Sequence, residues 1–452
     1  MRVRRLVMTG AAAVVLLASA CGSRGADEGG VQRLKGQRLE VAAVWSGEEQ
    51  VNFEKVLRRF ERRTGAEVRF TSTGRNIATV LGSRIEGGDS PDVALLPQPG
   101  LLGDLARSGA LEPIEPVAGS LVDANYAPVW RELGSVDGTL YGVWFKAANK
   151  STVWYRTKAF FDAGVAPPKT WEKFQEVSAK LAGKGLVPLA IGADDGWTLT
   201  DWFENVYLRT AGAQSYERLS KGQLPWTDAS VKRALRRLSE IFGRPDWLAG
   251  EPAETDFEES VRQVFADPPQ AAMVYEGDFV ASAIANIGKA KSGEGAQSFD
   301  FPAIADSKPA LQGGRGARAR PLVAGGDVAV LFTDNRAAKQ LIRFLATPEA
   351  AEPWARSGGF VSPNSNVDPH AYKDTTSQRA AGALANSPVV FDLSDQQPPA
   401  FGAIEGQGMR EILRKYLTSP VTSPAAVDAV AQRLEEAGTA AKRCERETGG
   451  QC

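Results

Sequence analysis

The chain has 452 residues, of which 43% are hydrophobic and 24% are charged, a composition typical of globular domains. Its formal net charge of −1 excludes a broad basic surface, so we expect no nucleic-acid partner. Without its first segment about four hundred residues remain, which predicts two lobes of about 150–200 residues each.

The first thirty residues are organised like a bacterial export signal. The basic residues Arg2, Arg4 and Arg5 precede an uncharged apolar run over residues 6–20, and small residues lead to Cys21. A basic start, a short apolar segment and small residues at the cut are typical of a secretory signal. The apolar run is shorter than the ~20 residues that span a bilayer.

A cysteine directly after the cut is typical of a lipobox, in which the thiol is lipidated and becomes the mature N-terminus. We therefore expect a signal peptide over residues 1–20, a lipid on Cys21, and a flexible linker over residues 21–36. This places the protein on the outer face of the cytoplasmic membrane, attached to its lipid through Cys21. The alternatives are an uncleaved anchor helix, a plain signal with a chance cysteine, and a twin-arginine signal at Arg4–Arg5.

The remaining cysteines and the single histidine argue against metal or redox chemistry. Cys444 and Cys452 lie close enough to form a short tail disulfide in an oxidising compartment. The only histidine, His370, follows a proline in a polar stretch that predicts a solvated loop. The sequence therefore offers no metal-ligand spacing and no Ser-His-Asp set, and we expect no metal, no cofactor and no catalytic residue.

The first part of the folded region alternates strands and helices. We expect strands over residues 38–45, 66–71 and 91–97, with helices between them that end at Thr64–Gly65 and at Gly87–Gly88. Residues 46–49 form a capping-box pattern at the start of the first helix. This order predicts an α/β fold with a parallel sheet and right-handed crossovers.

Ligands of such sheets bind beyond the carboxyl ends of the strands, which draws attention to the loops at residues 45–48, 72–76 and 97–100.

The rest of the chain is richer in helix. The expected strands are residues 140–145, interrupted by the polar residues 146–150, then 151–155, 271–275, 299–304 and 326–332. The expected helices are residues 171–181, 200–209, 230–242, 337–346 and 408–417. A Gly- and Arg-rich stretch at residues 313–320 is typical of a solvated loop.

Several motifs, in order along the chain, resemble the extracellular solute-binding lipoproteins (family 1) of carbohydrate ABC transporters. They are PDV at 91–93, PQPG at 97–100, GTLYGV at 138–143, STVWY at 151–155, PKTW at 168–171, AMVYEG at 272–277 and AGGD at 324–327. The sequences TDWFE at 200–204 and LRTAG at 208–212 are similar to the branch that binds α-glucosides. The resemblance covers nearly the whole mature chain.

The resemblance implies a two-lobed, periplasmic-binding-protein-like α/β fold of type II, with strands crossing between lobes near residues 146–153, 300–303 and 327–329. The expected division is lobe 1 from residues 37–147 and 302–328, lobe 2 from 148–301 and 329–440, and a tail from 441–452. Closure of two lobes on a ligand is a known hinge motion.

The implied function is capture of a small-molecule carbohydrate, such as an oligosaccharide α-glucoside, and its delivery by a monomer to ABC permease subunits in the membrane.

Sugar chemistry directs the choice of site residues. A pyranose has an apolar C–H face that suits an indole ring and a rim of hydroxyls that suits carboxylates, amides and guanidinium groups. The sequence ADDGW at 193–197 combines these features, so we expect Asp195 and Trp197 in the site, with a plain helix cap and a packed indole as the alternative.

By the same chemistry and by the resemblance, the other candidates are Trp45, Glu48, Asn76, Gln98, Asn149, Glu276, Gly325, Gly326, Gln407 and Arg410. Asp201 and Glu204 have the alternative role of favourable charges in the first turn of a helix.

Two departures from the α-glucoside branch leave the sugar open. That branch often has cysteines near Leu189 and Ala271, and an acidic residue where Asn76 stands. One alternative is a binding protein for a glycerophosphodiester, a peptide or a polyamine. The other is an exported glycosidase, which needs two carboxylates flanking the sugar. The adjacent acids Asp194–Asp195 and Glu258–Glu259 point apart instead, which argues against the glycosidase.

Overall fold

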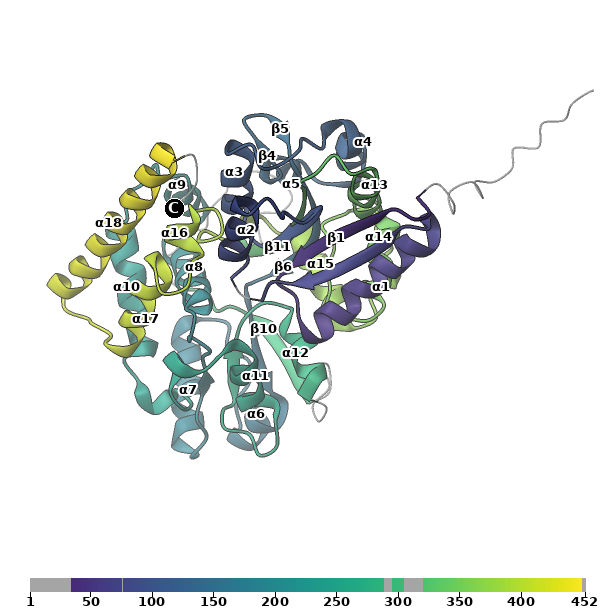
Figure 1. Cartoon of the computed structure of the whole chain (residues 1–452). Coiled ribbons are helices and arrows are strands. Elements are labelled where there is room, and N and C mark those ends of the chain that lie inside the picture. Colours follow the sequence, from purple (N-terminus) through teal and green to yellow (C-terminus); the bar gives the residue numbers. More distant parts are fainter. Residues whose placement is uncertain (1–33, 75, 288–294, 305–319, 449–452) are drawn as a thin grey trace, which may run out of the picture.

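The computed structural model describes residues 34–74, 76–287, 295–304 and 320–448, which form two lobes (Figure 1). In lobe 1 the strands β1 (Arg38–Ala43), β2 (Glu67–Ser72) and β3 (Val93–Leu96) are parallel, in the order β3-β1-β2. Two crossover helices, α1 (Gly47–Thr64) and α2 (Ile77–Glu86), connect them. The predicted parallel sheet is therefore confirmed.

The ends of α1 follow the sequence only in part. The helix ends at Gly65, whose φ of 75° lies in the left-handed region that glycine tolerates. The expected capping box does not form, because Ser46 makes no side-chain hydrogen bond to the helix. The first turn of α1 instead carries Glu48 and Glu49, whose charges favour a helix N-terminus.

Two long strands complete the sheet of lobe 1. Strand β11 (Leu322–Leu331) runs antiparallel to β3 and to β6 (Gly142–Asn149), and its first residues pair with β12 (Val389–Phe391). The expected break at residues 146–150 is wrong, because backbone pairing with β11 continues through Lys146 to Asn149. Polar side chains do not end a strand as long as its backbone remains paired with the neighbouring strand.

Lobe 2 is built around a smaller sheet. Its strand order is β10-β7-β9-β8, and their bounds are Ala296–Asp300, Thr152–Arg156, Met273–Tyr275 and Leu189–Ala190. The main helices around it are α7 (Trp171–Gly183), α8 (Trp197–Ala211), α10 (Ala229–Phe242), α17 (Gly408–Thr418) and α18 (Pro424–Thr448). Trp202 on α8, which is fully buried, contacts Tyr275 on β9 with ring centroids 4.7 Å apart.

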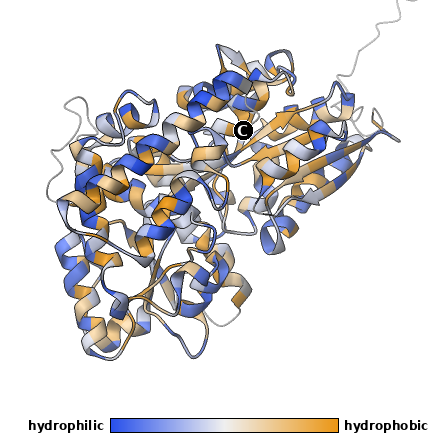
Figure 2. Cartoon of the chain, turned by 60° about the vertical axis from the view of Figure 1, so that its left-hand side comes forward, coloured by the Kyte–Doolittle hydropathy of each residue, from blue (hydrophilic) through white to orange (hydrophobic). Residues whose placement is uncertain are grey.

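Shorter elements complete both lobes. Those of lobe 1 are α3 (Pro99–Arg107), α4 (Glu115–Asn125), α5 (Pro128–Leu133), β4 (Ser135–Val136) and β5 (Thr139–Leu140). Those of lobe 2 are α6 (Thr157–Ala163), α9 (Ala213–Ser220), α11 (Phe257–Phe265), α12 (Val280–Ile287) and α16 (Pro399–Gly402). Figure 2 shows hydrophobic residues concentrated on the strands and on the helix faces that cover them.

The expected boundary between the lobes is wrong after residue 328. Helices α13 (Arg336–Leu345), α14 (Pro348–Ala355) and α15 (Thr375–Asn386) pack on lobe 1, where Trp354 is fully buried against Trp45 and Phe53. Since β11 lies inside the sheet of lobe 1, the helices that follow it cover that sheet. The chain returns to lobe 2 only at β12, a crossing that the sequence did not reveal.

The expected crossing at residues 300–303 is also displaced, because Phe301 and Ile304 both pack in the core of lobe 2.

At its C-terminal end the described chain forms helix α18, which packs on lobe 2. The expected tail over 441–452 is part of α18 as far as Thr448, and Cys444 on this helix is disulfide-bonded. Cys452 lies outside the described residues, as do Cys21 and residues 313–319 of the Gly- and Arg-rich stretch, so pairing with Cys452 stays a prediction. His370 is exposed in a short 3-10 turn, Pro369–Ala371. No helix in the described part of the chain has the length and hydropathy needed to cross a membrane.

Candidate functional site

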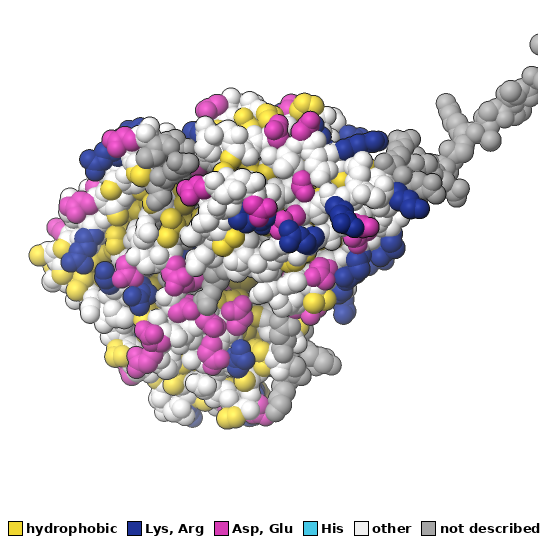
Figure 3. Space-filling model, in the orientation of Figure 1, with side chains coloured by type: hydrophobic (Ala, Val, Ile, Leu, Met, Phe, Trp, Pro, Cys, Tyr) yellow, Lys and Arg dark blue, Asp and Glu magenta, His cyan; other side chains and the backbone are white. Residues whose placement is uncertain are grey.

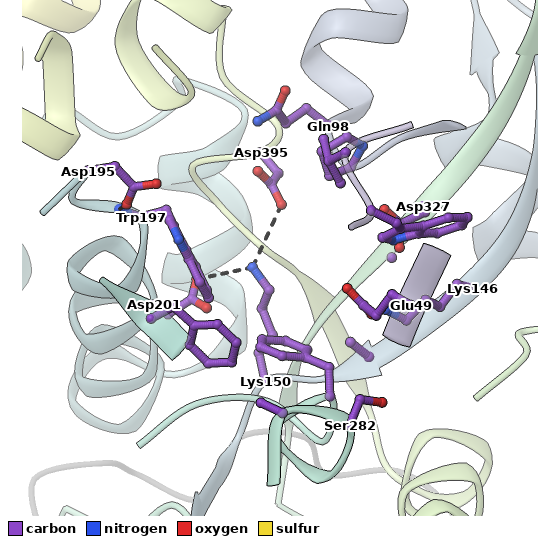
Figure 4. Close-up of a pocket in the computed structure, with 18 of the residues that line it drawn as sticks. Glu49, Gln98, Lys146, Lys150, Asp195, Trp197, Asp201, Ser282, Asp327 and Asp395 are labelled. Atoms are coloured by element: carbon purple, nitrogen blue, oxygen red, sulfur yellow. Dashed lines mark hydrogen bonds and ion pairs between the residues drawn. The ribbon is translucent and has the colours of Figure 1, made fainter. Parts of the chain in front are cut away.

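A cavity of about 520 Å³ lies between the two lobes and is lined by both (Figure 4). Lobe 1 contributes the loops that follow β1 and β3, as expected for the carboxyl ends of parallel strands. The strands that cross between lobes form its floor, and the starts of α8, α11 and α17 form the opposite wall. Of the predicted residues, those that line it are Trp45, Glu48, Gln98, Asp195, Trp197, Gly326 and Arg410.

The lobe 1 wall is anchored by Trp45. This indole is only 3% exposed, because it packs edge-on against Phe53 and Trp354 with ring centroids 4.8 Å away in both cases. Gln98, on the loop after β3, is also buried, and its Oε1 has no hydrogen-bond donor among the described residues. This amide oxygen can accept a hydrogen bond from a ligand.

The lobe 2 wall is a cluster of three aromatic rings. Trp197 lies 5.4 Å from Phe257 and 6.0 Å from Phe279, and the two phenylalanines are 5.5 Å apart. All three rings line the cavity and remain partly exposed. Together they offer an apolar surface of the kind that covers the C–H face of a flat ligand.

Gly196 explains how Asp195, Trp197 and Arg410 come together. Its φ is +83°, and a Cβ there would lie 2.8 Å from the backbone oxygen of Arg410. Only glycine therefore lets the start of α8 approach α17 this closely. Asp195 accepts a hydrogen bond from the Trp197 amide at 3.3 Å at the start of α8 and also lines the cavity, so its role in ligand binding stays a prediction.

The floor of the cavity holds a buried charge cluster centred on Lys150. The Nζ of Lys150 lies 2.5 Å from Asp392, 3.2 Å from Asp201 and 3.8 Å from Asp395. Asp201 is fully buried, and because α8 begins at Trp197 it lies beyond the first turn of the helix, so the alternative role as a favourable first-turn charge is wrong. The same holds for Glu204, which accepts hydrogen bonds from the amides of Leu393 and Ser394.

Burial and the Lys150 ammonium have opposite effects on the pKa values of the carboxyl groups in this cluster. Burial disfavours the charged form of Asp392, but the Lys150 ammonium and the Asp395 amide outweigh it and hold the pKa of Asp392 below its ordinary value. Burial raises the pKa of Asp201 to about 8, with the Asp392 charge adding to the effect. The structure thus pairs one ionised carboxylate with Lys150 and favours a proton on its neighbour at neutral pH.

A second lysine holds the lobe 1 side of the floor. The Nζ of Lys146 is 2.5 Å from Glu49 and lies 5.7 Å from the centroid of the Trp45 ring. Asp327, on β11 beside it, is 7% exposed, and burial raises its pKa to about 6 against the lowering effect of Lys146.

One oxygen each from Asp201, Glu204 and Asp392 lie within 4.8 Å of one another, a spacing that a metal ion accepts. The Lys150 ammonium and the backbone amides of Leu393 and Ser394 already supply positive partners to these carboxylates. We therefore assign the group to an ion-pair cluster rather than to a metal site.

Five predicted site residues lie away from this cavity. Asn76 is exposed at the start of α2 and faces Glu405 at 3.5 Å, and Gln407 is exposed at the start of α17. Asn149 is buried and accepts from the Ser151 amide, so it shapes the strand crossing.

Glu276 and Gly325 lie behind the cavity wall. Glu276 is 1% exposed and lies beside Asp201, while a Cβ on Gly325 would meet the Lys150 side chain at 2.7 Å. Gly325 therefore makes room for Lys150 rather than for a ligand, and the expectation that its backbone lines the cavity is wrong.

Sequence reasoning missed several residues that line the cavity: Glu49, Lys146, Lys150, Phe257, Glu258, Phe279, Asp327 and Asp395. Most of them follow an apolar strand or begin a helix. The hydropathy pattern alone gives little reason to choose residues at such positions as ligand-binding residues. The pairing of Lys150 with Asp392 spans 242 residues and has no local signature.

Comparison with known proteins places the chain in a defined group. The family model described as bacterial extracellular solute-binding protein matches residues 45–352. The chain is 32% identical over 376 residues to the osmoprotective compounds-binding protein GgtB of Synechocystis sp., an alignment that covers 81% of this chain and 86% of GgtB. It is 34% identical over 386 residues to the alpha-glucosides-binding periplasmic protein AglE of Rhizobium meliloti, covering 82% of each.

Solved structures share the fold. The bacterial solute receptor AcbH superposes with a TM-score of 0.77 at 20% identity, covering 89% of this chain and 99% of AcbH. A chitin oligosaccharide binding protein superposes with a TM-score of 0.74 at 22% identity, covering 89% and 99%. These likenesses confirm the two-lobed α/β fold.

We expect Lys150→Met to destabilise the protein by about 3–5 kcal/mol, because removal of one partner leaves buried carboxylates without their cation. The loss should stay constant from pH 8 to about 5 and shrink only as pH falls below about 4: the depressed pKa of Asp392 contributes stability that is fully present above its unfolded pKa and is lost as pH falls towards the lower folded pKa. Thermal and urea unfolding at several pH values measure this. Lys158→Met is the matched control, since the Lys158–Asp162 pair is exposed. Equal losses in the two variants would contradict a central role for Lys150.

Proposed function

The chain belongs to the bacterial extracellular solute-binding proteins, and from this premise we propose that it captures a saccharide between its two lobes for an ABC importer. The single observation that carries the proposal is the cavity in which an aromatic cluster (Trp197, Phe257 and Phe279) faces polar groups from lobe 1 and the strand crossings. Closure of the lobes would bury the ligand and present both lobes to membrane permease subunits.

The chemistry of the walls supports a sugar. The aromatic cluster suits the C–H face of a pyranose, while Asp195, Gln98 and Asp327 suit its hydroxyl rim. Hydrogen bonds to charged groups contribute about 1.5–3 kcal/mol each. The cavity volume of about 520 Å³ lies within the range usual for small-molecule sites.

An α-glucoside is the substrate that we propose within this class. The similarity to AglE, whose name states that it binds alpha-glucosides, and the sequence TDWFE at 200–204 support it. GgtB, of comparable similarity, is named for osmoprotective compounds, so the panel of test ligands includes compatible solutes as well. The relatives are binding proteins, which fits a receptor without catalysis, and we propose that it acts as a monomer.

Thermal-shift titration with maltose, trehalose, sucrose, glycosylglycerol, a dipeptide, spermidine and glycerophosphocholine tests the proposal. Binding should stabilise the protein by about 2.7 kcal/mol at a hundredfold excess over Kd. Trp197→Ala should weaken saccharide binding by about 1–3 kcal/mol through loss of the stacking surface. Phe161→Ala, which removes a ring that is 86% exposed and outside the cavity, should leave the affinity unchanged.

A response to the peptide, the polyamine or the glycerophosphodiester without any saccharide response would contradict the sugar assignment. Turnover of a bound saccharide would contradict a receptor without catalysis.

We also propose that Cys21 anchors the protein to the outer face of the cytoplasmic membrane by a lipid. Cys21 lies outside the described residues, and the support is the sequence pattern around it. The described chain begins at Leu34, which is buried in lobe 1 and whose amide donates to the Thr64 carbonyl, so the expected linker over residues 21–36 is too long and the tether that we propose is residues 21–33.

Expression of Cys21→Ser should move the protein from the membrane fraction to the medium or the soluble fraction after cell fractionation. The expected reason is loss of the thiol that carries the lipid. A Cys444→Ser variant is the control for loss of any cysteine, and it should stay with the membrane. Membrane association of the Cys21→Ser variant would contradict the lipid anchor.

A further inference from the structure

The side chains that line the cavity carry a surplus of negative charge. Seven carboxyl groups face three cationic groups, and because burial raises the pKa of Asp201 to about 8 and that of Asp395 well above its usual range, five of the seven carry a charge at neutral pH. The carboxyl groups are those of Glu48, Glu49, Asp195, Asp201, Glu258, Asp327 and Asp395, and the cations are Lys146, Lys150 and Arg410. Charges interact more strongly in a partly buried cavity than in water, so the sign of this surplus matters to a ligand.

The three cations already have partners within the protein. Lys146 pairs with Glu49, and Lys150 pairs with Asp201 and Asp392. Arg410 donates its Nε–H to the Gly402 carbonyl at 3.2 Å. An incoming carboxylate or phosphate would therefore have to compete with existing ion pairs at Lys146 and Lys150, whereas at Arg410 the printed contact engages only the Nε–H.

Three of the carboxylates have no such partner. Within the described residues, Glu48, Glu258 and Asp327 accept no hydrogen bond and form no ion pair within 4.0 Å. Asp327 is the most telling, because it is 7% exposed and lines the cavity. A buried carboxylate without a donor costs free energy, and a ligand that supplies a donor or a cation relieves that cost.

The aromatic cluster adds to the attraction for cations. The Nζ of Lys150 lies 5.7 Å from the centroid of the Trp197 ring, and the Nζ of Lys146 lies 6.0 Å from that of Phe279. Aromatic faces attract ammonium groups at such separations. The wall that suits a sugar ring thus also suits a positive charge.

A second cavity, of about 350 Å³, adjoins the first and is lined mainly by acidic residues. It shares Asp195 and Arg410 with the first, and its other charged residues are Asp194, Glu254, Glu405, Glu411 and Arg414. Acidic side chains also gather over the lobe 2 part of the face in Figure 3, whereas Lys and Arg gather towards α1. The acidic residues around both cavities therefore produce a negative potential that attracts a cationic ligand.

We propose that this cavity selects its saccharide by charge: it rejects saccharides that carry a phosphate or a carboxylate, and it binds an amine-bearing saccharide at least as tightly as the neutral one. The inference rests on the proposed function, because it concerns the same cavity. The amine would meet the unpartnered carboxylates of Glu48, Glu258 and Asp327, and the hydroxyls would keep the contacts of the neutral sugar.

Calorimetric titration with a matched series tests the proposal. The neutral probe is trehalose or maltose, whichever gives the larger thermal shift, and it is compared with its glucosamine-containing and phosphorylated derivatives. We expect the amine derivative to bind at least as tightly as the neutral sugar, and the phosphate derivative at least about tenfold more weakly. The preference for the amine should fall as salt is raised, because ions screen the attraction.

Substitutions at two neighbouring residues, Glu258 and Glu259, test whether the carboxylate of Glu258 contacts the amine. Glu258→Gln should weaken the amine derivative about threefold relative to the neutral sugar. Glu259→Gln should not change that ratio, because Glu259 lies one residue away on α11, does not line the cavity and pairs with Arg262 at 2.9 Å. Both substitutions exchange a carboxylate for an amide near the start of α11, so the comparison separates the cavity from the helix.

The outcomes distinguish this inference from the proposed function. A phosphate derivative that binds within threefold of the neutral sugar, an amine derivative that binds tenfold more weakly, or equal effects of Glu258→Gln on amine and neutral ligands would each overturn charge selection while saccharide binding stands. Failure of every saccharide, neutral or charged, would overturn the proposed function itself. Binding of the amine derivative alone would support charge selection.

Discussion

The burial of Lys150 among carboxylates is the interaction on which the arrangement of the cavity depends. Lys150 follows β6 directly, at the point where the chain crosses from lobe 1 to lobe 2. Its ammonium joins α8 through Asp201 to the segment after β12 through Asp392. Because a buried charge is tolerated only when it is paired, these three parts of the chain must meet at one place. The floor of the cavity lies where these three parts of the chain come together.

The same requirement links the hinge to the ligand. The crossings of β6, β11 and β12 lie beside one another, and the side chains that they hold in place include Lys146, Asp327 and Asp395 of the cavity. In the proposed function, a ligand held between the aromatic cluster of lobe 2 and the loops of lobe 1 would also contact the strands that cross between the lobes. Such contacts would couple binding energy to the lobe closure that we propose.

The sequence predicted what local patterns determine and missed what depends on distant pairing. The strands and helices of residues 38–97 follow from hydropathy period and from Gly65, so their parallel order was predictable. The lobe to which α13 and α14 belong was not predictable, because it depends on which strands pair with β11. The residues of a strand do not determine by themselves which strands it pairs with. Trp197 was predictable from its neighbours Asp195 and Gly196, whereas Lys150 stood in a run that seemed to interrupt a strand and has its partner 242 residues away.

The central claim is that the cavity between the lobes binds a saccharide ring against the aromatic cluster. A crystal structure of the protein grown with the saccharide that gives the largest thermal shift tests it most directly. The account predicts density for a pyranose ring stacked on Trp197, Phe257 or Phe279, with hydroxyls within hydrogen-bond distance of Asp195 or Asp327, and with Lys150 still paired to Asp392. A saccharide bound outside this cavity, or with its rings turned away from all three aromatic side chains, would contradict the account.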